Sequence, residues 1–183
     1  MANLIIKPTS GGSLVLQDEG GDAALTVDTS GKVTIGSWAP PAGCIIGVEN
    51  TTTTTIVAKE NTTYTTVIED SITVKAGSKV LINISCPIAC TGDNDPAGGQ
   101  VLQTGTASAT IMAGREIMDE HHASSGGYFG VTLMSGVLSA AGSYTFSFQG
   151  NRLSGDGPVY FVSANPGTGS ASIASMTLYE IAQ

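Results

Sequence analysis

Hydrophobic and polar residues alternate along much of the chain with a period of two. The clearest case is residues 79–85, where Val80, Ile82 and Ile84 occupy one set of alternate positions. Because successive side chains of an extended chain point to opposite faces, this pattern predicts a strand with one buried face. Further strands are predicted at residues 48–57, 62–68, 71–74, 101–113, 128–134, 143–149, 159–163 and 172–181.

Shorter strands are predicted ahead of this region, at residues 13–17, 23–28 and 32–36, with glycine-rich turns between them. Trp38, Pro40 and Pro41 follow, and the two prolines stiffen the backbone and exclude a helix. We place a linker there, with Trp38 as a candidate anchor against a neighbour. The chain is therefore expected to have a small N-terminal β-rich anchoring segment at residues 1–39 and a main domain at residues 40–183.

The main domain is predicted to be an all-β, jelly-roll β-sandwich. Eight or more short strands with glycine-rich turns follow residue 43, and their number fits a jelly roll better than a small barrel. Tyr144, Phe146 and Phe148 alternate, so they share one face of a strand. Packing between the two sheets is the favoured interpretation of this face, and a sugar-stacking platform is the alternative. For residues 113–122, whose charges fall at helical spacing, a helix and a polar strand-loop both stay open.

The content and net sign of the charged residues limit the classes of partner that the chain is expected to bind. Charged residues make up only 12% of the 183 residues, against a usual share of roughly 25%, which suggests surface hidden against other subunits. The formal net charge of −8 repels phosphate backbones, so no nucleic acid is expected as a partner. The apolar stretches are too short to cross a bilayer, and the first twelve residues hold no apolar signal region. We therefore expect synthesis in the cytoplasm and no membrane insertion.

Three cysteines, Cys44, Cys86 and Cys90, form an odd set without a signal peptide, which argues against a disulfide framework. Cys86 and Cys90 have a C-x3-C spacing, which could be half of a metal site. No second Cys/His pair stands at a suitable spacing, so the favoured interpretation is small buried residues at a strand end.

An acidic loop is a candidate calcium site. Asp93, Asn94 and Asp95 bring carboxylate and amide oxygens close together, and these are the ligands that calcium prefers. The remaining ligands of a known calcium loop are missing, and the same residue types are ordinary turn formers. A plain turn is therefore the favoured interpretation, with calcium as the alternative.

The densest polar cluster runs from Glu116 to His122 and also contains Asp119, Glu120 and His121. A metal or acid–base site is one interpretation, because histidine both ligates metals and titrates near neutrality. Adjacent histidines point in different directions on a strand or a helix, so they cannot form the paired ligands of a zinc protease. A solvated loop or a set of contacts at a subunit interface is favoured.

Patterns of known catalytic sites are missing from the sequence, including a nucleophile elbow, a P-loop and a dinucleotide fingerprint. Carboxylate pairs such as Glu69 with Asp70 can be drawn, but the sequence gives no distance between them. We therefore assign no catalytic, cofactor-binding or metal-binding residue, expect no cofactor, and expect the chain not to be an enzyme.

Three stretches resemble structural proteins of bacteriophages. Residues 64–82 (YTTVIEDSITVKAGSKVLI) and residues 171–182 (ASIASMTLYEIA) resemble blocks of fibre and capsid-decoration proteins, and residues 11–35 resemble N-terminal segments of marine-type tail fibres. Ala76 and Gly77 stand where the family's turn usually contains proline. The resemblance implies a trimeric jelly-roll domain like those of tumour necrosis factor and the complement heads, and it carries no catalytic residues.

The resemblance also implies a function. The expected role is a non-enzymatic structural protein of the virion, either a short trimeric fibre or a capsid decoration (cement) protein on the particle surface. Expected partners are two further copies in a homotrimer and other capsid or tail proteins. The alternative is a receptor-binding tail-fibre tip that recognises a host cell-surface glycan or protein. A choice between head and tail is left open.

Overall fold

The structure is a computed structural model that describes residues 14–17, 23–31, 33–35, 41–91, 96–106, 109–118, 125–155, 157–163 and 171–183. The chain divides into two compact units, Met1–Pro40 and Pro41–Gln183. Within the described residues every regular element is a strand. A search of the same residues for helices able to cross a membrane finds none.

The first unit holds three short strands, β1 (Leu14–Gln17), β2 (Ala23–Val27) and β3 (Val33–Ile35), in one antiparallel sheet of order β1-β2-β3. A tight turn follows β2, where Gly31 N donates to Asp28 O at 3.0 Å and Gly31 takes a φ of +83°. The Asp28 carboxylate accepts from Ser30 N at 2.8 Å, which fixes the turn from its side chain. The three short strands predicted from the sequence are confirmed.

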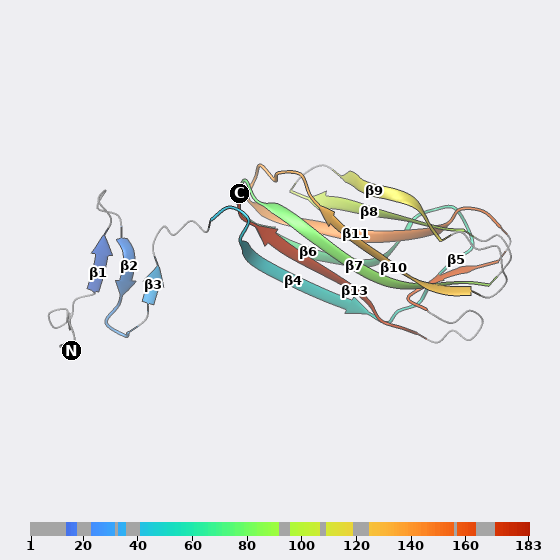
Figure 1. Cartoon of the computed structure of the whole chain (residues 1–183), viewed down its shortest axis with the longest axis horizontal. Helices are drawn as coiled ribbons and strands as arrows, with labels where there is room; N and C mark the ends of the chain where they lie inside the picture. The colour runs from blue at the N-terminus through green and yellow to red at the C-terminus, as the bar shows by residue number, and fades with distance from the viewer. Residues whose placement is uncertain are drawn as a thin grey trace. The chain divides into compact units, whose positions relative to one another are not determined.

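The second unit is built from ten strands in two sheets (Figure 1). Their bounds are β4 (Ile45–Thr53), β5 (Val57–Lys59), β6 (Thr65–Val74), β7 (Lys79–Cys90), β8 (Ala97–Gly105), β9 (Thr110–Met118), β10 (Ser125–Met134), β11 (Gly142–Arg152), β12 (Val159–Phe161) and β13 (Ala174–Ile181). One sheet has the order β4-β13-β7-β12-β5, with β10 also paired to β7. The other sheet has the order β6-β11-β8-β9.

The connections between the two sheets give a jelly roll. Strands β13 and β10 pair with opposite edges of β7, so that part of the first sheet has the order β4-β13-β7-β10. The first strand of the domain, β4, therefore lies beside the last, β13, and the next long strand, β6, lies beside β11 in the facing sheet. Two stacked antiparallel sheets with this nested order are the jelly-roll sandwich. The predicted all-β jelly-roll fold is confirmed.

Several strands extend beyond their predicted ends, and at three places the division into strands differs from the prediction. Residues 62–68 and 71–74 belong to one strand, β6, because pairing with β11 continues through Glu69 and Asp70. The strand predicted at residues 48–57 is interrupted between Thr53, where β4 ends, and Val57, where β5 begins, and in this interval Thr55 N donates to Thr53 Oγ1 at 3.1 Å. Residues 101–113 divide at Gly105, whose φ of +103° ends β8. The local pattern alone thus wrongly predicted a strand end at the polar residues 69–70, and it did not predict the strand end at Gly105.

The helical alternative for residues 113–122 is wrong over its described part. Residues 113–118 belong to β9, which pairs antiparallel with β8 from Gln103↔Thr110 to Ala97↔Met118. Charges at helical spacing carry little weight here, because cross-strand pairing supplies the backbone hydrogen bonds. Residues 119–122 lie outside the described part of the chain.

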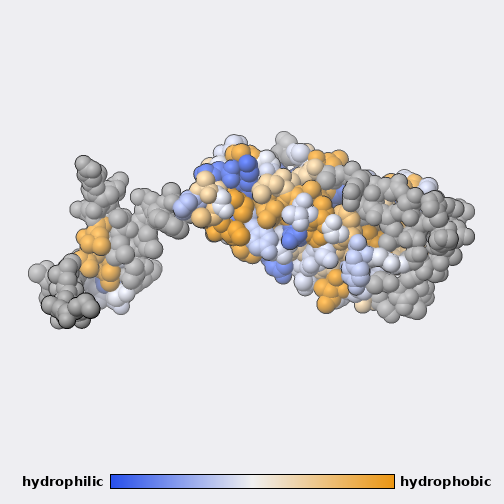
Figure 2. Space-filling model, in the orientation of Figure 1, coloured by the Kyte–Doolittle hydropathy of each residue, from blue (hydrophilic) through white to orange (hydrophobic). Residues whose placement is uncertain are grey.

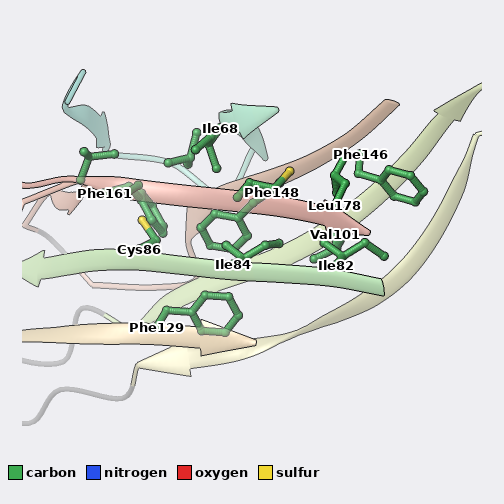
Figure 3. Packing of buried hydrophobic residues seen from close by; sticks show 14 of the residues in the cluster. Ile68, Ile82, Ile84, Cys86, Val101, Phe129, Phe146, Phe148, Phe161 and Leu178 are labelled. Carbon is green, nitrogen blue, oxygen red and sulfur yellow. The ribbon is translucent and has the colours of Figure 1, made fainter. Parts of the chain in front are cut away.

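The core lies between the sheets and is closed by aromatic rings (Figure 3). Phe148 stacks on Phe129 at a centroid distance of 5.0 Å and meets the edge of Phe161 at 6.0 Å. Tyr144 and Phe146 are also buried, and the Tyr144 hydroxyl donates to Ala140 O at 3.0 Å. Burial of each such side chain contributes roughly 1.5–3 kcal/mol. The prediction that these alternating aromatics fill the core is confirmed, and a sugar platform at this position is wrong.

A buried glutamate joins the last strand to the turn between β6 and β7. Glu180 Oε1 accepts from Lys75 N at 2.6 Å and from Ser78 Oγ at 2.7 Å. The turn itself closes through Ser78 N and Lys75 O at 3.2 Å, and Gly77 at φ +86° occupies its left-handed position. Glycine adopts that backbone conformation without steric cost, so the turn forms without the proline seen in the resembling proteins.

Candidate functional site

The two buried cysteines lie inside the sandwich. Cys86 and Cys90 are not part of a disulfide and are 0% exposed, and they stand four residues apart on one face of β7. Four residues of extended strand separate their Cα atoms by roughly 13 Å, too far for both thiols to bind one metal ion. Burial raises the pKa of the Cys86 thiol to about 12, and a hydrogen bond from the Val162 backbone lowers it only in part. The structure thus agrees with small buried residues, the favoured interpretation.

The other candidates from the sequence fall largely outside the described residues. Asp93, Asn94 and Asp95 lie there, as do residues 119–122, so calcium binding and the role of the polar cluster stay predictions. Glu116 has a described backbone in β9, opposite Gly98. In the described ranges, three or more Cys, His, Asp or Glu side chains never gather closely enough to hold a metal ion.

The pair Glu69 and Asp70 does not form a carboxylate site. As neighbours on β6 they point to opposite faces, with Glu69 exposed and Asp70 half-buried. Asp70 Oδ1 accepts from Ser71 N at 2.8 Å, while Oδ2 is buried without a hydrogen-bond partner among the described residues. Opposed side chains cannot act together on one glycosidic bond.

The outer face of the β4-β13-β7-β10 sheet is the most distinctive surface of the domain. Alternate residues of these strands, such as Ile82, Ile84 and Leu178, are buried in the sandwich, so their neighbours point outward. Cross-strand pairing arranges the outward side chains in three rows of four. The rows are Val48, Tyr179, Leu81 and Met134; Asn50, Thr177, Asn83 and Thr132; and Thr52, Ser175, Ser85 and Gly130. All are neutral, in a chain whose net charge is −8.

The first of these rows is an apolar stripe, which we call the apolar row. Val48 is 53% exposed and Met134 is 50% exposed, and half-buried Tyr179 and Leu81 connect them across the sheet. Strands β4, β13, β7 and β10 lie toward the viewer in Figure 1, and Figure 2 shows orange hydrophobic patches beside pale and blue polar surface over them. Exposed apolar side chains in contact with one another mark a surface that gains free energy when covered.

The other two rows enclose a shallow depression, which we call the polar hollow. It has a volume of about 150 Å³ and is lined by Asn83, Ile84, Ser85, Ser175 and Thr177. Two hydrogen bonds fix the orientation of lining side chains: Thr132 Oγ1 donates to Asn83 Oδ1 at 2.7 Å, and Asn50 Nδ2 donates to Thr177 Oγ1 at 2.7 Å. The hollow therefore has a defined, neutral and hydrogen-bonding floor.

Sequence reasoning did not find this face. Its rows join residues of four strands that are up to about 130 positions apart, for example Val48 and Tyr179. The one local signal is the set of polar residues Asn83 and Ser85 between the buried positions of β7, which marks an outward face without saying what lies beside it.

Comparisons with known proteins leave the chain without an assigned family. No family model matches it, and no curated protein sequence does. Among solved structures, the VP2 subviral particle of infectious bursal disease virus aligns at 11% identity with a TM-score of 0.43, over 75% of this chain and 37% of that one. The Gx strain of the same virus aligns at 12% identity with a TM-score of 0.42, over 89% and 46%. This chain thus spans less than half of those chains, and a likeness of this degree adds nothing to the strand pairing described above.

Proposed function

We propose that this chain is a non-enzymatic structural protein on the surface of a bacteriophage particle, either a short trimeric fibre or a capsid decoration protein. The observation that carries the proposal is the apolar row, which lies beside two rows of neutral polar residues on the outer face of a jelly roll. Such a face is suited to repeated contact with other copies of the chain. The N-terminal segment, residues 1–39, is proposed to dock the domain to another capsid or tail protein.

The placement of the resembling sequence blocks supports the virion assignment. Residues 64–82 include all of β6, the turn that follows it and the start of β7, while residues 171–182 include all of β13. Pairing of Tyr179 with Leu81 brings the two blocks together, and Glu180 hydrogen-bonds the turn of the first block. Blocks about 100 residues apart therefore make one packed unit, as expected if both are retained for the same fold.

The occupant of the apolar row is proposed to be a second copy of this chain. Copies with a net charge of −8 repel one another, so a contact between them is favoured where carboxylates are missing. The three neutral rows meet that condition, and the apolar row adds a gain of roughly 25 cal/mol for each Å² of apolar surface buried. A stable contact buries about 800 Å² on each partner, so the row would form the centre of a larger interface.

The virion role is tested on purified particles. Mass spectrometry and gel densitometry of a phage that encodes this chain should find it in many copies per particle, and antibody-labelled images should place it on the outer surface. Absence from purified particles, with the chain found only in the infected-cell lysate, would overturn the proposal.

A second candidate function is recognition of the host surface, as a receptor-binding tip. The polar hollow favours it, because a fixed set of neutral hydrogen-bonding groups is suited to ligand recognition as well as to subunit contact. In that case the chain should be scarce in particles, and the free protein should block adsorption to host cells.

A further inference from the structure

We propose that the polar hollow binds a neutral saccharide. This inference rests on the second candidate function, recognition, and requires that the polar hollow is not covered by a second copy of the chain. The hollow has a volume of about 150 Å³, below the roughly 300–1,000 Å³ of pockets that enclose a whole drug-sized ligand. It therefore suits one sugar unit of a longer glycan, with the rest of the glycan lying over the sheet.

The charge of the surface selects the class of sugar. Every residue of the three rows is neutral, and the chain as a whole carries a charge of −8. A sialic acid, uronic acid or sugar phosphate would find no cation among these rows and would meet a repulsive field. Neutral hexoses and N-acetylhexosamines have no such penalty.

The floor of the hollow offers unused hydrogen-bonding groups. Ser85 and Ser175 stand directly opposite each other on β7 and β13, and within the described chain neither hydroxyl has a hydrogen-bond partner. The Asn83 carbonyl oxygen accepts from Thr132, which leaves the Asn83 amide hydrogens free to donate. Thr177 Oγ1 accepts from Asn50 and keeps its own hydrogen to donate. Sugar hydroxyls both donate and accept, so they match this mixed set.

An exposed tyrosine lies on β10, the strand that pairs with the Asn83–Ser85 side of the hollow. Tyr128 is 73% exposed on the outer face of β10, and Gly130 is the next outward residue of the same strand. Gly130 lies opposite Ser85, and a Cβ added to it would meet no atom within 4 Å. Gly130 therefore places no side chain beside Ser85, and the apolar ring face and polar hydroxyl of Tyr128, two residues away on β10, suit the C–H face and rim of a pyranose.

The test uses the full chain and an array of neutral and acidic oligosaccharides, followed by titration calorimetry with the strongest neutral glycan. We expect binding to neutral glycans only. The Gly130→Val variant should weaken binding at least 10-fold, because the new side chain projects into the open side of the hollow. Its melting temperature should not fall, since the site has room and valine favours strands. Tyr128→Ala should weaken binding to a similar extent.

A matched control is Gly136→Ala, which also fills open space but lies after β10 and away from the hollow. It should bind as the wild type does. Binding that survives Gly130→Val, binding to acidic glycans alone, or no binding to any glycan would overturn the inference. Sedimentation of the same samples separates the two proposals: if Gly130→Val changes the oligomer mass while no glycan binds, a second copy covers the hollow.

Discussion

Two strand glycines of the same domain are predicted to respond in opposite ways to a single methyl group. Gly150 in β11 is buried, and a Cβ placed on it would clash with the Phe161 ring, at 2.5 Å from Cε2 and 2.6 Å from Cε1. The ring is itself 0% exposed and held against the edge of Phe148, so it has no space into which to retreat. Gly130 in β10 has open space where its Cβ would lie.

The expected loss of stability in Gly150→Ala follows from how tightly the core is packed around Phe161. Overpacking of a tight core costs about 1–3 kcal/mol, and the ring must shift by roughly 1 Å to restore normal contact, so Gly150→Ala should fall in the upper half of that range. For a domain of this size, each kcal/mol lowers the melting temperature by about 2–4 °C. Gly150→Ala should therefore melt about 4–12 °C lower than the wild type. Gly130→Ala should be unchanged or more stable by up to about 1 kcal/mol, because alanine loses less conformational entropy on folding.

Urea denaturation followed by circular dichroism, together with thermal melts, measures both variants against the wild type. Equal loss of stability in both variants would show that strand glycines matter for backbone reasons alone. Full stability of Gly150→Ala would show that Phe161 does not pack on β11 as described, and the arrangement of the core would need revision.

Four further predictions concern cysteine accessibility, buried groups and a turn. At pH 8, a thiol reagent should modify half-buried Cys44 in the native protein, and Cys86 and Cys90 only after unfolding. Because burial raises the pKa of Cys86 from 9.0 to about 12, the unfolded state loses its proton first, and the free energy of unfolding should fall by up to about 1.4 kcal/mol per pH unit between pH 9 and 12. Urea melts at pH 8 and 10.5 should show this slope reduced in Cys86→Ala; an equal slope would contradict it. Glu180→Ala should cost about 2 kcal/mol in urea melts, since two buried donors lose their acceptor, and a cost near zero would refute that role. Gly105→Ala should also lower the melting temperature, because its φ is +103° and a Cβ would lie 2.5 Å from Ser143 O; an unchanged melt would argue against this turn.

The sequence contained enough information to predict the fold class, and the reason is local. Tyr144, Phe146 and Phe148 alternate with polar neighbours, and Val80, Ile82 and Ile84 alternate with neighbours that are polar except for Leu81, so inward faces can be recognised without any long-range contact. Breaks between strands were harder to predict. Gly105 ends a strand because of its backbone conformation, whereas the acidic pair at residues 69–70 interrupts a hydrophobic pattern without ending the strand.

The surface with functional interest could not be predicted, because it is assembled by pairing. Asn83, Ser85 and Ser175 are unremarkable polar residues in the sequence, and they become one hollow only when β13 lies beside β7 in a particular register. A shift of one residue would send these side chains inward. The charged clusters at residues 93–95 and 116–122 lie largely outside the described residues, so their roles stay predictions.

The trimeric state is the part of the proposed function that one measurement tests most directly. Sedimentation equilibrium of the full chain should give three times the 18.5 kDa monomer mass. The double variant Val48→Glu and Met134→Glu should sediment as a monomer, because it places carboxylates in the apolar row. The control variant Thr73→Glu, at an exposed position of β6, should stay trimeric. A wild-type monomer at micromolar concentration, or a double variant that keeps the full trimer mass, would contradict association through this face.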